Sequence, residues 1–224
     1  INSSSNSVYL AYGTNPSTIT LGNASQAGTI IGSSYIATAT TTLNLYGASA
    51  SYPFTITGSN INWGGANTKT HLKWADIQVD VVTGGGGKTV IFDGNMTIDA
   101  FTVSAGDVLN VTTAGTVITG TYGKNLGSYG TLRLKGSLGN NIIVTGVGAD
   151  YNGVMFYGGT ADLQYVTITA PPANEVYGLR FENTINIINL DNLNITGGWA
   201  AGVFFVAGKN TITNSTIHHG SGAS

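Results

Sequence analysis

The sequence contains no cysteine, which excludes disulfide bonds and thiolate metal sites. Only 8% of its 224 residues are charged, and the net charge is −2. A chain with so few positive charges is not expected to bind nucleic acid or an anionic membrane surface. Long apolar runs are also missing, so the sequence predicts no membrane-spanning segment.

Helical periodicity is absent as well, which leaves strands and turns as the expected elements. Apolar residues make up 42% of the chain, enough to bury a core. The polar residues are mostly Thr, Ser and Asn, and they accompany 33 glycines. These residues are typical of short strands joined by tight turns, so the fold class predicted is all-β.

Three copies of one sequence unit occupy the C-terminal part of the chain. They begin at Gly153, Gly178 and Gly202, which lie 25 and 24 residues apart. A second unit of apolar-x-x-x-x-Ile form follows each of them, in the segments 163–168, 190–195 and 212–217. A period in the twenties built from short strands is typical of a solenoid whose coils stack on one another.

Alternation within these units predicts which side chains enter the core. We expect inward columns formed by Val166, Leu193 and Ser215, by Ile168, Ile195 and Ile217, and by Phe156, Phe181 and Phe204. The outward residues are then Thr167, Asn194 and Thr216, and the strand should bend at Tyr165, Asn192 and Asn214. The two asparagines at the bend either form a side-chain ladder along the stack or are present because turns tolerate asparagine.

The predicted β-helix spans residues 88–224, about five to six coils of 24 residues each. Residues 1–83 are β-rich without a visible period and form either a small sandwich or the opening coils. Between them, Gly84–Gly87 is either a domain boundary or a wide turn. Lys88 and Thr89 after these glycines imitate a phosphate-binding loop, but a strand follows in place of the required helix, so nucleotide binding is not predicted.

Several segments resemble right-handed parallel β-helix proteins of the pectin-lyase-like superfamily. The resemblance rests on segments 101–109, 130–137, 151–156 and 210–217 and covers about residues 88–224. It implies a secreted or cell-surface β-helix, but the superfamily includes lyases, hydrolases, adhesins and structural fibres, so it implies no single function.

Enzymes of that superfamily use clusters of carboxylates on one outer face, with Ca²⁺ or as acid and base. This chain has ten acidic residues and no Asp-Asp or Asp-x-Asp pair, which makes an enzyme the less favoured interpretation. Asp93, Asp99 and Asp107 form either a weak Ca²⁺ site or solvated turns. His218 and His219 point to opposite faces of a strand, so they indicate a solvated segment more than a metal site.

Six N-x-Ser/Thr sequons are candidate glycosylation sites in a secreted glycoprotein: Asn2, Asn23, Asn95, Asn110, Asn194 and Asn214. Of these, Asn95, Asn110 and Asn194 should point outward. Exposed Tyr and Trp side chains leave glycans open as a second kind of partner.

The functional hypothesis is a non-enzymatic extracellular structural protein, the subunit of a self-assembling surface filament or surface layer. Its expected partners are other copies of itself, stacked head to tail through free strand edges. The candidate assembly strand comprises Val8, Tyr9, Leu10, Ala11 and Tyr12. The alternatives are a carbohydrate-active β-helix protein, either an enzyme or a glycan-binding module, and a viral fibre or adhesin.

Overall fold

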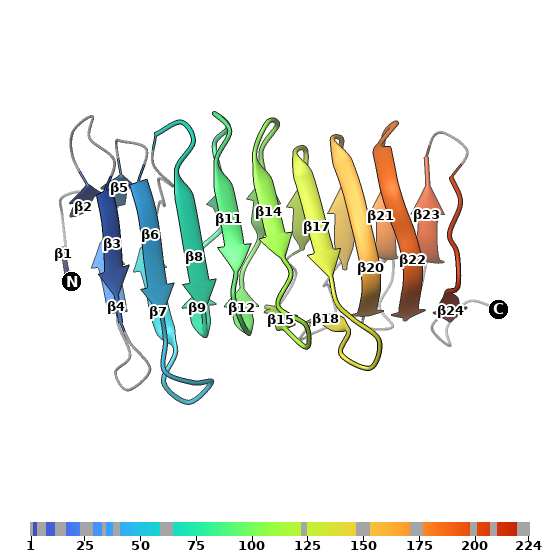
Figure 1. The fold of residues 1–224 in the computed structure, drawn as a ribbon, viewed down its shortest axis with the longest axis horizontal. Helices are drawn as coiled ribbons and strands as arrows, with labels where there is room; N and C mark the ends of the chain where they lie inside the picture. Colours follow the sequence, from blue (N-terminus) through green and yellow to red (C-terminus); the bar gives the residue numbers. More distant parts are fainter. Residues whose placement is uncertain are drawn as a thin grey trace.

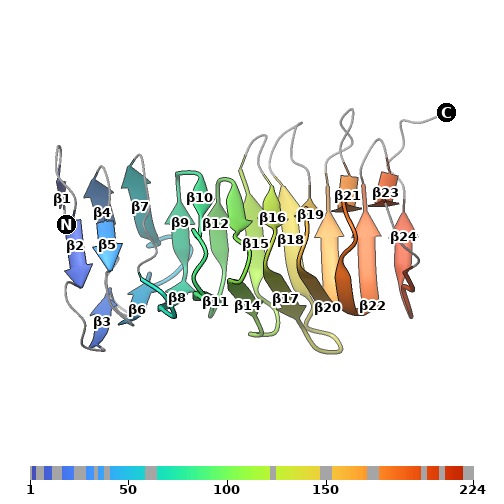
Figure 2. The same cartoon turned by 90° about the horizontal axis from the view of Figure 1, so that it is seen from above.

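The protein is a parallel β-solenoid of about six complete turns, as seen in a computed structural model (Figures 1 and 2). Every element in the described part of the chain is a β-strand. The described residues therefore contain no helix that is long and apolar enough to cross a membrane. The predicted fold class is therefore confirmed. The structure describes residues 2–3, 8–11, 17–22, 29–32, 35–37, 41–58, 65–121, 125–146, 153–170, 177–197, 201–206 and 210–218.

Each coil contributes strands to three faces, which we call faces one, two and three in chain order. Within a face, every strand pairs in parallel with the equivalent strand of the next coil. Face one contains β3 (Ser17–Leu21), β6 (Thr41–Tyr46), β8 (Lys69–Lys73), β11 (Thr89–Phe92), β14 (Val108–Val111), β17 (Thr131–Lys135) and the first halves of β20 (Thr160–Thr169) and β22 (Asn186–Thr196).

Face two continues each coil after a corner. It contains β1 (Asn2–Ser3), β4 (Thr29–Gly32), β7 (Phe54–Gly58), β9 (Ala75–Ile77), β12 (Met96–Ile98), β15 (Val117–Gly120), β18 (Ile142–Gly146), the second halves of β20 and β22, and β24 (Thr216–His218).

Face three is a six-stranded sheet. Its strands are β10 (Val81–Val82), β13 (Phe101–Val103), β16 (Leu126–Ser128), β19 (Val154–Phe156), β21 (Tyr177–Phe181) and β23 (Ala201–Phe205). The separate pair β2 (Val8–Ala11) and β5 (Tyr35–Ala37) occupies the same place in the order of the coil. The parallel columns also continue across the glycine stretch, because β8 before it pairs with β11 after it.

The corner between faces one and two is a single residue with positive φ in four coils. These residues are Trp74, Tyr165, Asn192 and Asn214, with φ between 47° and 53°. β20 and β22 pass through this corner without interruption, which joins faces one and two into one sheet. The three bends predicted from the repeats, at Tyr165, Asn192 and Asn214, are therefore confirmed.

The core is built from inward columns of apolar side chains, one member per coil. The column on face two consists of Phe54, Ala75, Met96, Ile118, Val144, Ile168 and Ile195, all of them buried. The outward positions Thr167, Asn194 and Thr216 are paired with one another as predicted.

One predicted core column contains an error of one residue. Phe156 stacks on Phe181 at 5.0 Å between ring centroids, but the third ring of the stack is Phe205, at 4.6 Å from Phe181. Phe204 is instead 37% exposed and points outward. Neighbouring residues of a strand face opposite sides of the sheet, so choosing the wrong phenylalanine of an adjacent pair reversed its side.

Two of the three repeated glycines, Gly153 and Gly178, lie where one coil touches the next. A Cβ atom on Gly153 would collide with the carbonyl oxygen of Gly178, and a Cβ on Gly178 would lie 2.7 Å from the carbonyl oxygen of Gly202. Only glycine allows the coils to approach so closely at the start of β19 and β21. At Gly202, in β23, a Cβ would lie 2.7 Å from the Ile217 side chain, so each copy of the repeat begins with a residue that has no side chain.

Candidate functional site

Among the described residues, the most deeply buried charged group is Asp107, whose residue is 0% exposed. Its carboxylate accepts hydrogen bonds from the Thr83 hydroxyl at 2.6 Å, the Gly85 amide at 2.8 Å and the Lys88 amide at 2.8 Å. All four glycines of Gly84–Gly87 have positive φ, and in this turn the Gly85 amide points to the carboxylate while the Gly84 amide donates to the Ser104 hydroxyl. The loop that imitates a phosphate site therefore holds a carboxylate of the next coil.

Asp162 forms a second buried carboxylate centre on face one, and it is 3% exposed. The Lys135 ammonium lies 2.9 Å away on the preceding coil, and the Asn189 amide donates to it at 2.9 Å from the following coil. Arg133 is nearby, with its Nε atom 3.9 Å from the carboxylate. Three successive coils, those of β17, β20 and β22, thus meet at one carboxylate.

A third polar cluster joins the coils of β6, β8 and β11. Asp93 Oδ2 lies 2.8 Å from His71 Nδ1 and accepts a hydrogen bond from the Tyr46 hydroxyl at 3.2 Å. Burial raises the pKa of Tyr46 above its ordinary value, and the nearby Asp93 carboxylate adds to this shift. The sequence interpretation did not find this cluster, although its His and Asp lie 22 residues apart, about one coil.

Trp74, at the corner between faces one and two, lines two cavities. One of about 260 Å³ lies beside Tyr46, Lys73 and Asp93. The other, of about 230 Å³, lies on face two and is lined by Trp74, Pro53, Asp76, Asn95, Thr97 and Thr119 among others.

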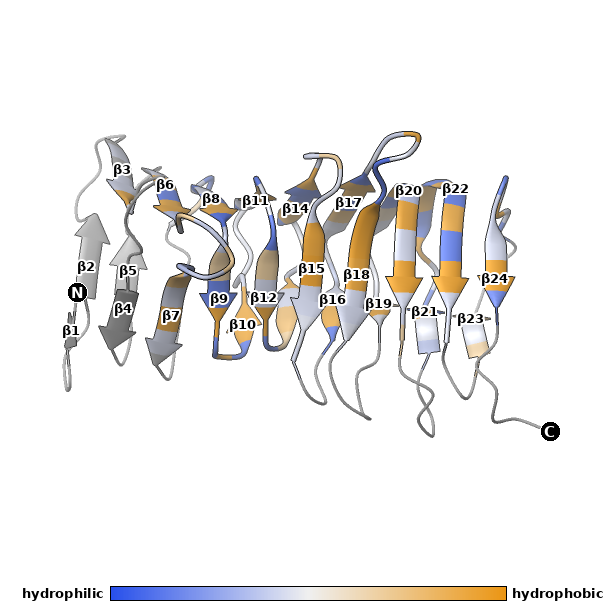
Figure 3. Ribbon diagram, turned by 90° about the horizontal axis from the view of Figure 1, so that it is seen from below, coloured by the Kyte–Doolittle hydropathy of each residue, from blue (hydrophilic) through white to orange (hydrophobic). Residues whose placement is uncertain are grey.

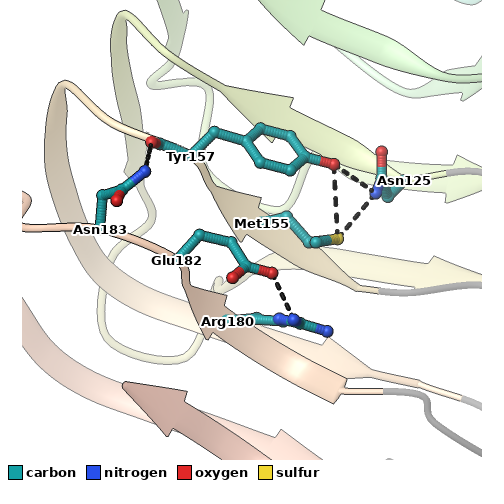
Figure 4. A network of polar contacts seen from close by, with 6 residues as sticks. All are labelled: Asn125, Met155, Tyr157, Arg180, Glu182 and Asn183. Carbon is teal, nitrogen blue, oxygen red and sulfur yellow. Dashed lines mark hydrogen bonds and ion pairs between the residues drawn. The ribbon is translucent and has the colours of Figure 1, made fainter. Parts of the chain in front are cut away.

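Face three carries an outward polar and aromatic surface over β16, β19 and β21 (Figure 4). The Asn125 amide donates to Met155 Sδ at 2.8 Å and to the Tyr157 hydroxyl at 3.3 Å, and Arg180 pairs with Glu182 at 2.5 Å. The Tyr157 ring lies over Gly127, because a Cβ there would be 2.9 Å from it. We call this surface, with its neighbours Tyr129, Tyr177 and Phe204, the aromatic strip.

The rings of the aromatic strip are arranged along the solenoid axis. Tyr129 and Tyr157 stack at 4.9 Å between ring centroids, and Tyr129 is 50% exposed. The Arg180 guanidinium lies 4.5 Å from the centre of the Tyr177 ring and 5.6 Å from that of Phe204. The strip thus presents aromatic faces and hydrogen-bonding groups together at the surface.

The three aspartates considered for Ca²⁺ lie in separate places. Asp93 binds His71 and Tyr46, Asp99 accepts a hydrogen bond from the Thr121 hydroxyl, and Asp107 is buried under the glycine loop. Within the described ranges, no group of three or more His, Cys, Asp or Glu side chains is placed to hold a metal ion. His218 lies exposed on β24, while His219 lies outside the described residues.

The sequon asparagines differ in how their side chains are engaged. Asn95 Oδ1 accepts a hydrogen bond from the Val117 amide, and Asn214 Nδ2 donates to Asp191. Asn110 Oδ1 is buried without a hydrogen-bond partner in the described structure, whereas Asn194 is exposed on β22. Asn2 begins β1, and Asn23 lies outside the described residues.

Asp191 binds the side chains of the two asparagines at the bend, Asn192 and Asn214. Asn192 Nδ2 donates to its Oδ2 at 2.7 Å, and Asn214 Nδ2 donates to its Oδ1 at 2.8 Å. Both amides thus bind this carboxylate in the described structure. Hydrogen bonds from the Thr213 hydroxyl and from Asn214 hold the pKa of Asp191 below its ordinary value.

The candidate assembly strand forms β2, which comprises Val8, Tyr9, Leu10 and Ala11 and pairs in parallel with β5. Tyr12 lies outside the described residues. One edge of the strand is therefore occupied within the chain.

No known protein family, curated protein or solved structure matches this chain.

Proposed function

We propose that this chain is a non-enzymatic structural protein of the cell exterior, whose coils stack into a surface filament or layer. The observation that carries the proposal is how its carboxylates are used. Asp93, Asp99, Asp107, Asp162 and Asp191 each accept hydrogen bonds from a residue of a neighbouring coil. These carboxylates thus connect successive coils along the axis of the solenoid.

The same geometry favours association between copies. Strands of two to six residues are stable only because each pairs with its counterpart one coil away, about 4.8 Å along the axis. A coil edge of another copy offers the same backbone groups and the same inward columns. β24 pairs with β22, and the described residues supply no partner for its other edge, where Ile217 is 45% exposed.

Electron microscopy and sedimentation of the purified 224-residue protein over a range of concentrations test the proposal. We expect end-to-end polymers that shorten in the variant Ile217→Lys, because a charge on the apolar edge opposes stacking. Thr216→Lys is the matched control, since Thr216 points outward from the same strand and should leave polymer length unchanged. A protein that stays monomeric at every concentration contradicts the proposal.

A second candidate function, glycan binding, is favoured by the aromatic strip. Sugar rings stack on exposed aromatic faces, and their hydroxyl groups need donors and acceptors of the kind that Asn125, Arg180 and Glu182 supply. Retention of the protein on immobilised polysaccharides would test this function. Tyr129→Ala should reduce retention, whereas Tyr52→Ala, which alters a 66% exposed tyrosine far from the strip in sequence, should not.

A further inference from the structure

Face two, whose strands β12, β15, β18, β20 and β22 lie side by side in Figure 3, carries a row of outward threonines, one in each of five successive coils. Backbone pairing places Thr97 beside Thr119, Thr119 beside Thr145, Thr145 beside Thr169, and Thr169 beside Thr196. We call these five residues the threonine row. Asp76 interrupts the column one coil before Thr97, and Thr55 follows beyond it.

Composition does not explain this row. Threonine accounts for 31 of the 224 residues, about one in seven, so five in succession at one structural position far exceeds a random arrangement. Strand propensity does not explain it either, because the middle outward column of face one carries His71, Ile91, Asn110, Arg133 and Asp162 in equivalent coils. The repetition is a property of face two.

The side chains of the row are available to solvent. Thr169 and Thr196 are exposed, and Thr97, Thr119 and Thr145 are partly exposed. None of the five hydroxyl groups has a hydrogen-bond partner among the described residues, whereas the hydroxyls of Thr83, Thr121 and Thr213 elsewhere bind carboxylates. Each position thus presents one methyl group and one hydroxyl that no described residue binds.

The backbone fixes these groups on a regular lattice. Successive coils are about 4.8 Å apart, and outward residues along one strand are about 6.6 Å apart. The second spacing is occupied in β20, where Thr167 accompanies Thr169, and in β22, where Asn194 accompanies Thr196. The inward neighbours Val144, Ile168 and Ile195 are fully buried, which holds the sheet rigid beneath the row.

We propose that the threonine row binds the surface of ice. Hydroxyls repeated at the coil spacing can each hydrogen-bond a water molecule, and the methyl groups between them leave those waters no other protein partner. A first water layer held with the spacing of the strands can join a growing ice lattice, whose oxygen atoms repeat at a similar interval. Because the row is already ordered, binding costs little conformational entropy.

The charge distribution supports this face over the other two. Face one presents Lys69, Lys73, Arg133 and Lys135, and face three presents the Arg180–Glu182 pair. Charges hold their own hydration shells and disturb an ordered water layer. From Thr97 to Thr196 the row itself contains no charged residue, and Thr97 and Thr119, at its Trp74 end, line the cavity of about 230 Å³.

Thermal hysteresis and inhibition of ice recrystallisation by the full chain test the proposal. We expect both activities in the unaltered protein and loss of most of each in Thr145→Tyr, whose bulk lifts the ice front from the centre of the row. Thr131→Tyr is the matched control, because Thr131 is an outward, partly exposed threonine on face one. It should retain activity, and both variants should keep the β-sheet circular dichroism of the parent.

Further variants separate the two groups that threonine provides. Thr119→Val keeps the branched shape without the hydroxyl, and Thr119→Ser keeps the hydroxyl without the methyl. Unaltered protein without ice activity overturns the proposal, as does equal loss in the Thr145 and Thr131 variants. Retention on insoluble crystalline polysaccharide that depends on Thr145, without ice activity, also overturns it and assigns the row to a polymer surface instead.

Discussion

Single hydroxyl groups in this solenoid change its stability in opposite directions, according to whether they point into the core or toward the surface. Ser128 is completely buried between Val103 and Phe156 in an inward column, and its hydroxyl has no hydrogen-bond partner in the described structure. Ser104, 24 residues earlier, accepts a hydrogen bond from the Gly84 amide at 2.8 Å. The same substitution should therefore change stability in opposite directions at the two sites.

We expect Ser128→Ala to raise the free energy of unfolding by about 1 kcal/mol, because it removes an unsatisfied buried hydroxyl. Ser104→Ala should lower it by about 1 kcal/mol or less, since a partly exposed hydrogen bond is lost. Chemical denaturation of both variants beside the parent measures the two signs. Destabilisation by Ser128→Ala would show that its hydroxyl is satisfied in solution.

The aromatic stack provides a second prediction for single residues. Phe181→Ala should cost about 3–5 kcal/mol, because it leaves a cavity between the rings of Phe156 and Phe205. Phe204→Ala removes a 37% exposed ring that contacts Arg180 and should cost about 1 kcal/mol. Thermal unfolding of the two variants distinguishes them, and equal losses would mean that the register of β23 differs from the one described.

Among elements, the loop Gly84–Gly87 depends on one carboxylate. Asp107→Asn keeps the shape of the side chain but offers a single acceptor oxygen where three donors converge. We expect a loss of about 3 kcal/mol, as at least one buried donor loses its partner. Asp76→Asn, on a partly exposed residue, should change stability by about 0.5 kcal/mol or less in the same denaturation experiment.

The coil of β24 is expected to respond to acid through Asp191. Its pKa is lower in the folded protein than in an unfolded chain, so its contribution to stability is present above the ordinary pKa of an aspartate. That contribution is lost as the pH falls through the folded pKa, where Thr213 and Asn214 lose their charged acceptor. Limited proteolysis near residues 210–218 should increase below about pH 4. Asp191→Asn should remove this pH dependence.

Elements that follow from local pattern were predictable from the sequence, and those that depend on register were less so. The coil period, the inward isoleucines and the bends at Tyr165 and Asn192 all repeat within one segment and could be read from it. The contact between His71 and Asp93 joins two segments that share no sequence repeat. Only the pairing of β8 with β11 in the structure therefore reveals it. The Phe204 error arose in the same way, because alternation fixes a side only after the register is known.

Over the whole molecule, the column arrangement makes each coil depend mainly on its two neighbours. Leu134 contacts the core from β17, in the middle of the described coils, whereas Ile195 lies in β22, next to the coil of β24, and both are fully buried. Replacing either with alanine should cost about 2–5 kcal/mol locally. In a solenoid, stability is close to a sum of coil and interface contributions, so this loss should not spread evenly.

Hydrogen exchange measured by mass spectrometry is therefore expected to differ between the two variants. Ile195→Ala should reduce protection in β20, β22 and β24 while leaving β8, β11 and β14 at the level of the parent protein. Leu134→Ala should reduce protection on both sides of β17, in β14 and in β20, because it weakens two coil interfaces at once. A uniform decrease across all strands in both variants would show instead that the coils unfold as a single cooperative unit.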